Sequence, residues 1–112
     1  MEKKTLEERI LYSSTLKNKY PGRIPVIIEK CKHDKSEFVI DRSKYLIPVE
    51  LDMAQFICLV RKRIKIDSRK AIFIFIDNVL LPMNQTMGEI YNTHKDPDGF
   101  LYVTYRLENT FG

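Results

Sequence analysis

The sequence predicts a single α+β domain, because helical and strand periodicities both occur along the chain without regular alternation. Three observations support this prediction. A strongly amphipathic segment at 53–65 indicates a helix, apolar runs at 23–30 and 100–106 indicate strands, and glycine- or proline-containing turns separate them. A chain of 112 residues has the size of one domain with its own core.

The composition is typical of a soluble globular protein, with 44% apolar and 30% charged residues. No stretch approaches the roughly 18 apolar residues that span a bilayer, and the N-terminus lacks the apolar region of a secretory signal. We therefore expect a cytosolic or nuclear protein. Cys31 and Cys58 fit no metal-binding or redox spacing, so both thiols are expected to be reduced.

The first part of the chain is predicted to form a helix followed by two strands. The sequence at 5–8 has the form of a capping box, and Pro21 and Gly22 end the helical pattern, which places a helix at about 5–19. Strand patterns follow at 23–30 and 44–48. Because each strand contains a proline, we expect an antiparallel pair with one edge left open.

Asp52 is predicted to cap the main helix, whose apolar residues fall on two stripes. The expected core stripe consists of Met53, Ile57, Val60 and Ile64. The neighbouring stripe consists of Phe56, Leu59 and Arg63. This second stripe is too apolar for a solvent-exposed face, yet it ends in a cation.

The segment at 71–76 is apolar on both faces, so we expect a central strand covered by the helix at 52–65 on one side and the N-terminal helix on the other. After it, the sequence predicts a short strand at 79–81, a short helix at 87–94, a well-marked turn at 96–99 and a last strand at 100–106.

After the leading helix, this order of elements is that of a β-grasp domain, the fold of ubiquitin. We expect a four- to five-stranded mixed sheet, one main core helix and an N-terminal helical extension. The predicted divisions of the single domain, residues 1–112, are an extension at 1–20, a β-grasp core at 21–106 and a C-terminal tail at 107–112.

Five segments resemble the autophagy-related protein 8 family of ubiquitin-like modifiers, which includes the light-chain-3 and GABA-receptor-associated proteins. They read KYPGRIPVIIEK (19–30), KYLIP (44–48), QFICLVRKRIKI (55–66), KAIFIF (70–75) and DPDGFLYVTYRLENTFG (96–112). They occur in the family's order and spacing and cover most of the chain after residue 18.

The resemblance implies that Gly112 is activated, passed to a conjugating enzyme and joined to phosphatidylethanolamine, with Thr110 and Phe111 forming the end of the tail. A glycine suits this chemistry because it leaves little bulk beside the attacked carbonyl. The implied partners are activating and conjugating enzymes, a processing and deconjugating cysteine protease, phosphatidylethanolamine, and cargo receptors. The lipidated form would reside on autophagosomal and related vesicle membranes. Gly112 is expected to be either encoded last or exposed by the protease.

The resemblance also implies a groove for peptides with the motif aromatic-x-x-aliphatic, which add as a strand beside residues 44–48. Its aromatic pocket would consist of Leu16, Pro25, Ile27, Lys44, Leu46 and Phe100. Its aliphatic pocket would consist of Tyr45, Ile47, Pro48, Leu51, Phe56 and Leu59. Acidic residues of the peptide would pair with Arg23, Arg42, Lys44 and Arg63. A second docking surface would consist of Ile72, Phe73 and Ile74.

The chain also departs from the family. The segment before the first strand is shorter, so the first of the usual two helices is expected to be reduced or absent. Tyr12 stands on the rim of the peptide pocket, where an acidic residue is common. An enzyme is not expected, because His33 and His94 stand alone and no phosphate-binding loop or metal spacing occurs. No cofactor and no nucleic acid are expected.

Two other interpretations are an unconjugated peptide-binding adaptor and a basic RNA-binding β domain. The second draws on the basic run at 61–65 and the aromatic strand at 100–105, in a chain with a net charge of +4. However, the glycine–aromatic pattern of an RNA-recognition motif is missing, and the basic run also suits a solvated helix face.

Overall fold

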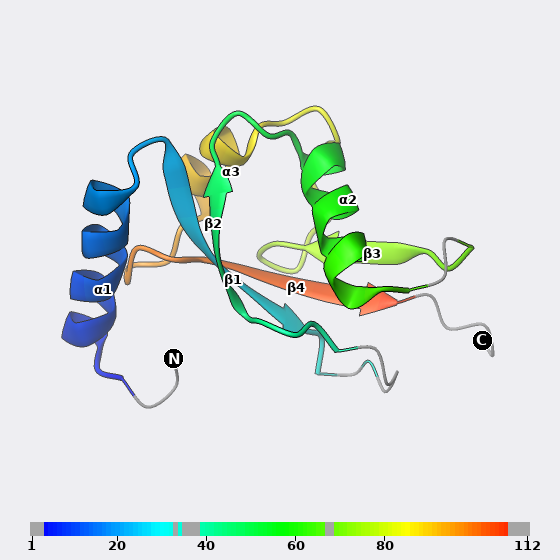
Figure 1. The fold of residues 1–112 in the computed structure, drawn as a ribbon, viewed down its shortest axis with the longest axis horizontal. Helices are drawn as coiled ribbons and strands as arrows, with labels where there is room; N and C mark the ends of the chain where they lie inside the picture. Colours follow the sequence, from blue (N-terminus) through cyan, green and yellow to red (C-terminus); the bar gives the residue numbers. More distant parts are fainter. Residues whose placement is uncertain (1–3, 33, 35–38, 67–68, 108–112) are drawn as a thin grey trace.

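The structure is a computed structural model that describes residues 4–32, 34, 39–66 and 69–107. In chain order, its elements are α1 (Leu6–Lys19), β1 (Arg23–Lys30), β2 (Lys44–Pro48), α2 (Met53–Ile64), β3 (Ile72–Phe75), α3 (Met87–His94) and β4 (Leu101–Leu107). These elements confirm the predicted α+β, ubiquitin-like fold with an N-terminal helix (Figure 1).

The strands form a mixed four-stranded sheet in the order β2-β1-β4-β3. The central strands β1 and β4 are parallel, with Val26 opposite Leu101, and each pairs antiparallel with an outer strand. The predicted antiparallel pairing of β1 with β2 is confirmed, and β2 is left as an edge strand.

Each helix begins with a reciprocal capping box, which satisfies backbone N–H groups that have no partner inside the helix. Thr5 and Glu8 cap α1, Asp52 and Gln55 cap α2, and Thr86 and Glu89 cap α3. The first cap and the role of Asp52 were predicted from the sequence.

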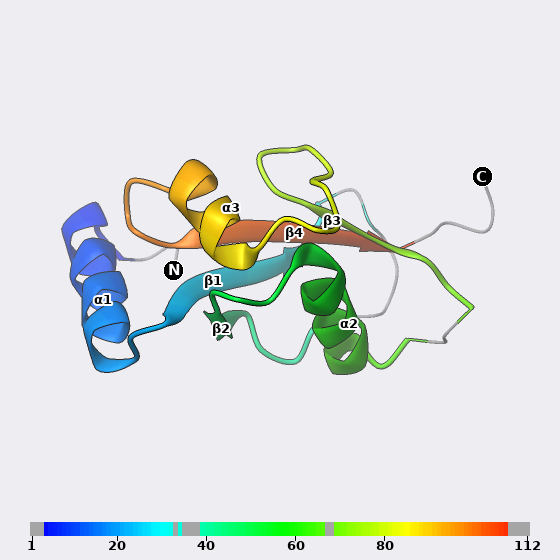
Figure 2. The ribbon, with the colours of Figure 1, turned by 90° about the horizontal axis from the view of Figure 1, so that it is seen from above.

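Helices lie on both faces of the sheet. Val26 and Ile28 on β1 belong to the main core with α2 and α3, while Ile27 points to the other face because side chains alternate along a strand. On that face α1 packs against β1, and the Tyr12 ring meets the Phe100 ring edge-on at 5.8 Å. Figure 2 shows α1 at the opposite end of the molecule from α2.

The face of α2 that enters the core differs from the prediction. Met53, Phe56, Val60 and Ile64 are its buried residues. Phe56 therefore belongs to the core stripe, whereas Ile57 is half-buried at its margin. The real stripe follows the 3, 4, 4 spacing that keeps side chains on one side of an α-helix.

The prediction of a central strand at 71–76 was wrong, because β3 is the edge strand beside β4. Its buried and exposed residues alternate, and the Phe73 side chain is 41% exposed. The short strand at 79–81 was also wrong. After a turn with positive φ at Asp77 and Asn78, only an isolated bridge between Ile76 and Val79 remains.

Candidate functional site

A cavity of about 460 Å³ lies between α1 and the open edge of the sheet at β2. The described lining residues come from α1, the segment before β2, β2 itself and the residue before β4: Tyr12, Leu16, Arg42, Lys44, Tyr45, Leu46 and Phe100. Aromatic and aliphatic groups form most of this lining, two cations contribute to it, and no described lining residue is acidic. Such a site suits an apolar side chain with negative charge nearby.

The position of α1 fixes one wall of this cavity. Ser13 donates from Oγ to the Asp98 carbonyl oxygen at 2.7 Å, and Arg9 Nε lies 3.0 Å from Asp98 Oδ2. Both contacts join α1 to the turn before β4. They hold Tyr12 over Phe100, which is the residue that follows this turn.

Cations surround the aromatic rings at this site. Lys44 Nζ lies 5.0 Å from the Tyr12 ring centroid, and the Arg63 guanidinium lies 5.6 Å from that of Tyr45. Burial raises the pKa of Tyr45 above its ordinary value, although the charge of Arg63 opposes this shift. The phenol is therefore neutral at physiological pH, and the local charge is positive.

The edge of β2 offers backbone groups to a further strand. Ile28 N donates to Ser43 O, and hydrogen-bonded pairs alternate along an antiparallel ladder. The backbone groups of Lys44 and Leu46 therefore face away from β1. Arg23 Nη1 donates to one of these outward groups, the Leu46 carbonyl oxygen, at 3.2 Å.

Of the predicted aromatic pocket, Leu16, Lys44, Leu46 and Phe100 come together around the cavity. Pro25 and Ile27 do not line it. Both are buried on β1, where the strand register places them opposite Leu46 and Lys44. Both residues therefore lie on the neighbouring strand, next to residues that line the cavity.

The predicted aliphatic pocket is divided differently. Ile47 and Phe56 are only 2% and 0% exposed and belong to the core. Leu51 and Leu59 are half-buried against that core, and Pro48 is half-buried too. Tyr45, which the resemblance assigned to the aliphatic pocket, lines the same cavity as Lys44 and Leu46.

The remaining predicted site residues are the second docking surface, Arg42 and the C-terminal tail. In the trio Ile72, Phe73 and Ile74, only Phe73 offers substantial surface, because both isoleucines are buried. Arg42 lines the cavity. Thr110, Phe111 and Gly112 lie outside the described residues.

Tyr12, which the resemblance put at the pocket rim but in neither set of pocket residues, lines the cavity. Its spacing of four from Leu16 puts both side chains on one face of α1. That spacing was a usable signal, although it became informative only once α1 was placed beside Phe100.

The described residues contain no helix with the length and apolar character needed to cross a membrane.

Comparisons with known proteins cover nearly the whole chain. The family model described as "Autophagy protein Atg8 ubiquitin like" matches residues 8–112.

Two curated relatives are Autophagy-related protein 8e of Arabidopsis thaliana and Autophagy-related protein 8 of Schizosaccharomyces pombe. The first is 52% identical over 107 residues, covering 95% of this chain and 86% of the plant protein. The second is 52% identical over 109 residues, covering 96% of this chain and 88% of the yeast protein.

The crystal structure of Trypanosoma brucei ATG8 has the same fold. Its TM-score is 0.90 at 35% identity, with 99% of this chain and 95% of that chain covered. The fold, the family model and the two relatives agree. The chain belongs to the Atg8 family of ubiquitin-like proteins, whose role is in autophagy.

Proposed function

We propose that this protein is a ubiquitin-like modifier that is joined through Gly112 to phosphatidylethanolamine and recruits cargo receptors to autophagosomal membranes. The observation that carries the proposal is the extent of the family match, which runs from residue 8 to Gly112. It includes most of α1, the edge strand β2 and the terminal glycine in one continuous match.

The groove beside β2 would receive a peptide with the motif aromatic-x-x-aliphatic. The peptide would pair with the outward backbone groups of Lys44 and Leu46, as in other cases of strand addition. Its aromatic side chain would enter the cavity between α1 and β2, and the aliphatic one would contact Pro48, Leu51 and Leu59.

Acidic residues beside the motif would meet Arg42, Lys44 and Arg63. Arg23 would have to share or leave the Leu46 carbonyl oxygen when the peptide strand pairs there. Exposed ion pairs contribute only about 0–1 kcal/mol each, so these cations select among peptides more than they set the total affinity.

The two apolar anchors should contribute about 1.5–3 kcal/mol each. After the cost of association, a net of about −8 kcal/mol corresponds to roughly micromolar affinity. Single contacts would therefore be weak, and many copies on one membrane would bind a multivalent receptor much more strongly.

In this function the protein itself is a modifier rather than a catalyst. Activating and conjugating enzymes would form the bond at Gly112, and a cysteine protease would expose the glycine or release the adduct. Two acyl chains would then hold the domain on the membrane, because each buried methylene contributes about 0.8 kcal/mol.

Reconstitution tests the conjugation. The chain is incubated with the activating and conjugating enzymes, ATP and liposomes containing phosphatidylethanolamine, and the lipid adduct is detected by mass spectrometry. We expect an adduct for the wild-type chain and none for Gly112→Ala. An adduct that forms equally in both would refute the proposal. Peptide binding without any adduct would favour the alternative of an unconjugated peptide-binding adaptor.

A further inference from the structure

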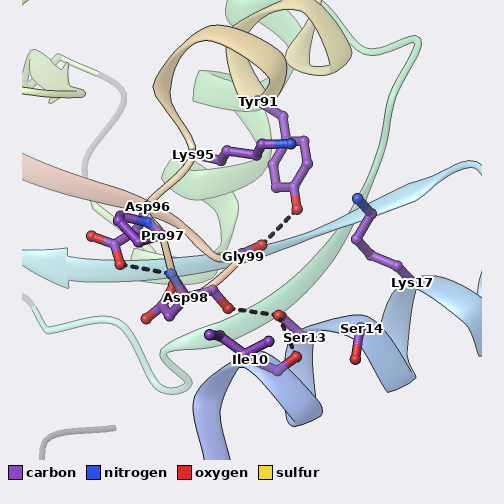
Figure 3. Close-up of a pocket in the computed structure, with 10 residues that line it drawn as sticks. All are labelled: Ile10, Ser13, Ser14, Lys17, Tyr91, Lys95, Asp96, Pro97, Asp98 and Gly99. Atoms are coloured by element: carbon purple, nitrogen blue, oxygen red, sulfur yellow. Dashed lines mark hydrogen bonds between the residues drawn. The ribbon is translucent and has the colours of Figure 1, made fainter. Parts of the chain in front are cut away.

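A second cavity, of about 400 Å³, lies on the opposite flank of α1 from the peptide groove. The described residues around it belong to α1, α3 and the turn before β4 (Figure 3): Ile10, Ser13, Ser14, Lys17, Tyr91, Lys95, Asp96, Pro97, Asp98 and Gly99. None of these residues lines the peptide groove described above.

Two lysines at this cavity have no carboxylate partner among the described residues. Lys17 Nζ lies 4.8 Å from the centroid of the Tyr91 ring, and Lys95 Nζ lies 5.4 Å from it. A ring orients an ammonium group without neutralising its charge. Both lysines therefore keep their N–H donors available to an anion.

The two aspartates of the lining are already engaged inside the protein. Asp98 is fully buried, and its carboxylate accepts from Arg9, the Tyr102 hydroxyl and Phe100 N. Asp96 Oδ2 accepts from Asp98 N at 3.0 Å. Arg9 balances the charge of Asp98, whereas Asp96 keeps its own negative charge. The two lysines therefore leave the described lining with an excess of positive charge.

The floor between the lysines is rigid. Tyr91 is buried and donates from its hydroxyl to Gly99 O at 2.6 Å, while Gly99 N donates to Asp96 O at 2.9 Å. An aromatic floor beside two lysine ammonium groups resembles the aromatic and basic lining of the peptide groove, where Lys44 adjoins Tyr12. It is suited to an anionic side chain with an aliphatic stem.

We propose that this cavity binds an acidic segment of a partner protein, with glutamate or aspartate carboxylates at Lys17 and Lys95 and their methylenes on Tyr91 and Ile10. A protein is favoured over a lipid headgroup because the cavity adjoins the start of β4, whereas Leu107 lies at its end, about 20 Å away along the strand. Figure 1 shows α1 and the end of β4 at opposite ends of the molecule. This choice of partner rests on the proposed attachment through Gly112.

The test uses the unlipidated, ¹⁵N-labelled chain and an end-blocked peptide of alternating glutamate and alanine, which has no aromatic residue. We expect saturable amide shifts at Ser14, Lys17, Lys95 and Gly99. Lys17→Gln and Lys95→Gln should each weaken binding by about threefold to fivefold, as expected for exposed ion pairs. Lys17→Arg should retain most of the affinity.

The matched control is Lys19→Gln. Lys19 is also an exposed lysine of α1 and lies 5.5 Å from the ring of Tyr20, away from the cavity. Its loss removes the same charge and should leave binding almost unchanged. Equal weakening by Lys17→Gln and Lys19→Gln would show non-specific attraction and would overturn the proposal.

Two further arms separate this site from its alternatives. Leu46→Ala, in the peptide groove, should bind the acidic peptide normally. The test of this cavity is therefore independent of whether the peptide groove binds its motif. Vesicles with and without phosphatidylserine test the lipid source. Binding to phosphatidylserine vesicles that depends on Lys17 and Lys95, without peptide binding, would overturn the assignment to a protein partner.

Discussion

Arg9 on α1 and Asp98 in the turn before β4 form an ion pair across 89 positions of sequence, with Nε 3.0 Å from Oδ2. Asp98 is completely buried, whereas about a quarter of the Arg9 side chain remains exposed. The pair joins α1 to the turn before β4, which lines one cavity and is followed by Phe100 of the other. The position of α1, and hence of both sites, depends on this buried carboxylate.

Replacing Asp98 should therefore destabilise the fold strongly. Asp98→Ala leaves Arg9, the Tyr102 hydroxyl and Phe100 N without their acceptor. We expect a loss of about 3–5 kcal/mol in the free energy of unfolding. Arg9→Ala should cost less, about 1–2 kcal/mol, because two donors to Asp98 remain. Urea unfolding measures both.

The control for these two variants is Asn18→Ala. Asn18 is an exposed residue of α1, and its replacement should change the free energy of unfolding by less than about 0.5 kcal/mol. A loss for Asp98→Ala as small as that of the control would contradict the structural role of the carboxylate.

Gly99 and Gly22 provide a matched test of how closely α1 packs on the turn. Both have positive φ, +89° and +85°, so alanine is strained at either position. A Cβ on Gly22 meets no atom within 4 Å, whereas one on Gly99 would clash with Ser13 Oγ and lie 3.0 Å from Ser13 Cβ.

We expect Gly22→Ala to cost about 1–2 kcal/mol from backbone strain alone. Gly99→Ala should cost about 1–3 kcal/mol more because of overpacking against α1. Thermal and urea unfolding of both variants measure the difference. Equal destabilisation would mean that α1 moves aside freely, contrary to the packing described here.

Much of the local structure was predictable because short-range chemistry determines it. The capping residues Thr5 and Asp52 and the pair Pro21 and Gly22 gave the helix limits within a residue or two. The strand patterns at 23–30 and 44–48 also predicted β1 and β2 at their observed bounds. The resemblance to the family then named six of the seven described residues that line the cavity between α1 and β2, although it divided them between two pockets and the acidic contacts.

Strand order was the main failure, because it depends on pairing between distant segments. Apolar residues on both faces of 71–76 suggested a central strand, yet β3 is at the edge and leaves Phe73 exposed. The sequence also did not show which residues of α2 belong to the core and which lie at its margin. A stripe containing Phe56 and Leu59 does not reveal that Phe56 faces the sheet while Leu59 lies at the margin.

Alkaline pH should reveal the environment of Tyr102. Burial raises the pKa of Tyr102 above its ordinary value of 10.0, and the adjacent Asp98 carboxylate raises it further. The unfolded chain therefore loses this proton at a lower pH than the folded chain. Stability from this group is complete below pH 10.0 and is lost as pH rises above it.

We expect Tyr102→Phe to be less stable than the wild type at about pH 8, because the hydrogen bond to Asp98 is lost, and to decline less steeply toward about pH 11. Urea midpoints of both proteins across this range give the slopes. Tyr20→Phe, at an exposed tyrosine, should follow the wild-type slope. Parallel slopes for Tyr102→Phe and wild type would refute the prediction.

Leu46 and Phe56, one in each pocket of the family pattern, should respond in opposite ways to truncation. Leu46 is half-buried and lines the cavity, so Leu46→Ala should weaken binding of an aromatic-x-x-aliphatic peptide by about tenfold at modest cost in stability. Phe56 is fully buried, so Phe56→Ala should lower the free energy of unfolding by about 3–5 kcal/mol. Any loss of binding would then follow from a damaged core.

Isothermal titration with the peptide and thermal unfolding of the same samples separate the two effects. Leu11→Ala is the control, because Leu11 is 68% exposed on α1 and lines neither cavity, and it should alter neither readout. If Phe56→Ala kept its stability and lost binding as Leu46→Ala does, Phe56 would have to face the ligand. The packing of α2 on the sheet would then be different from the one described here.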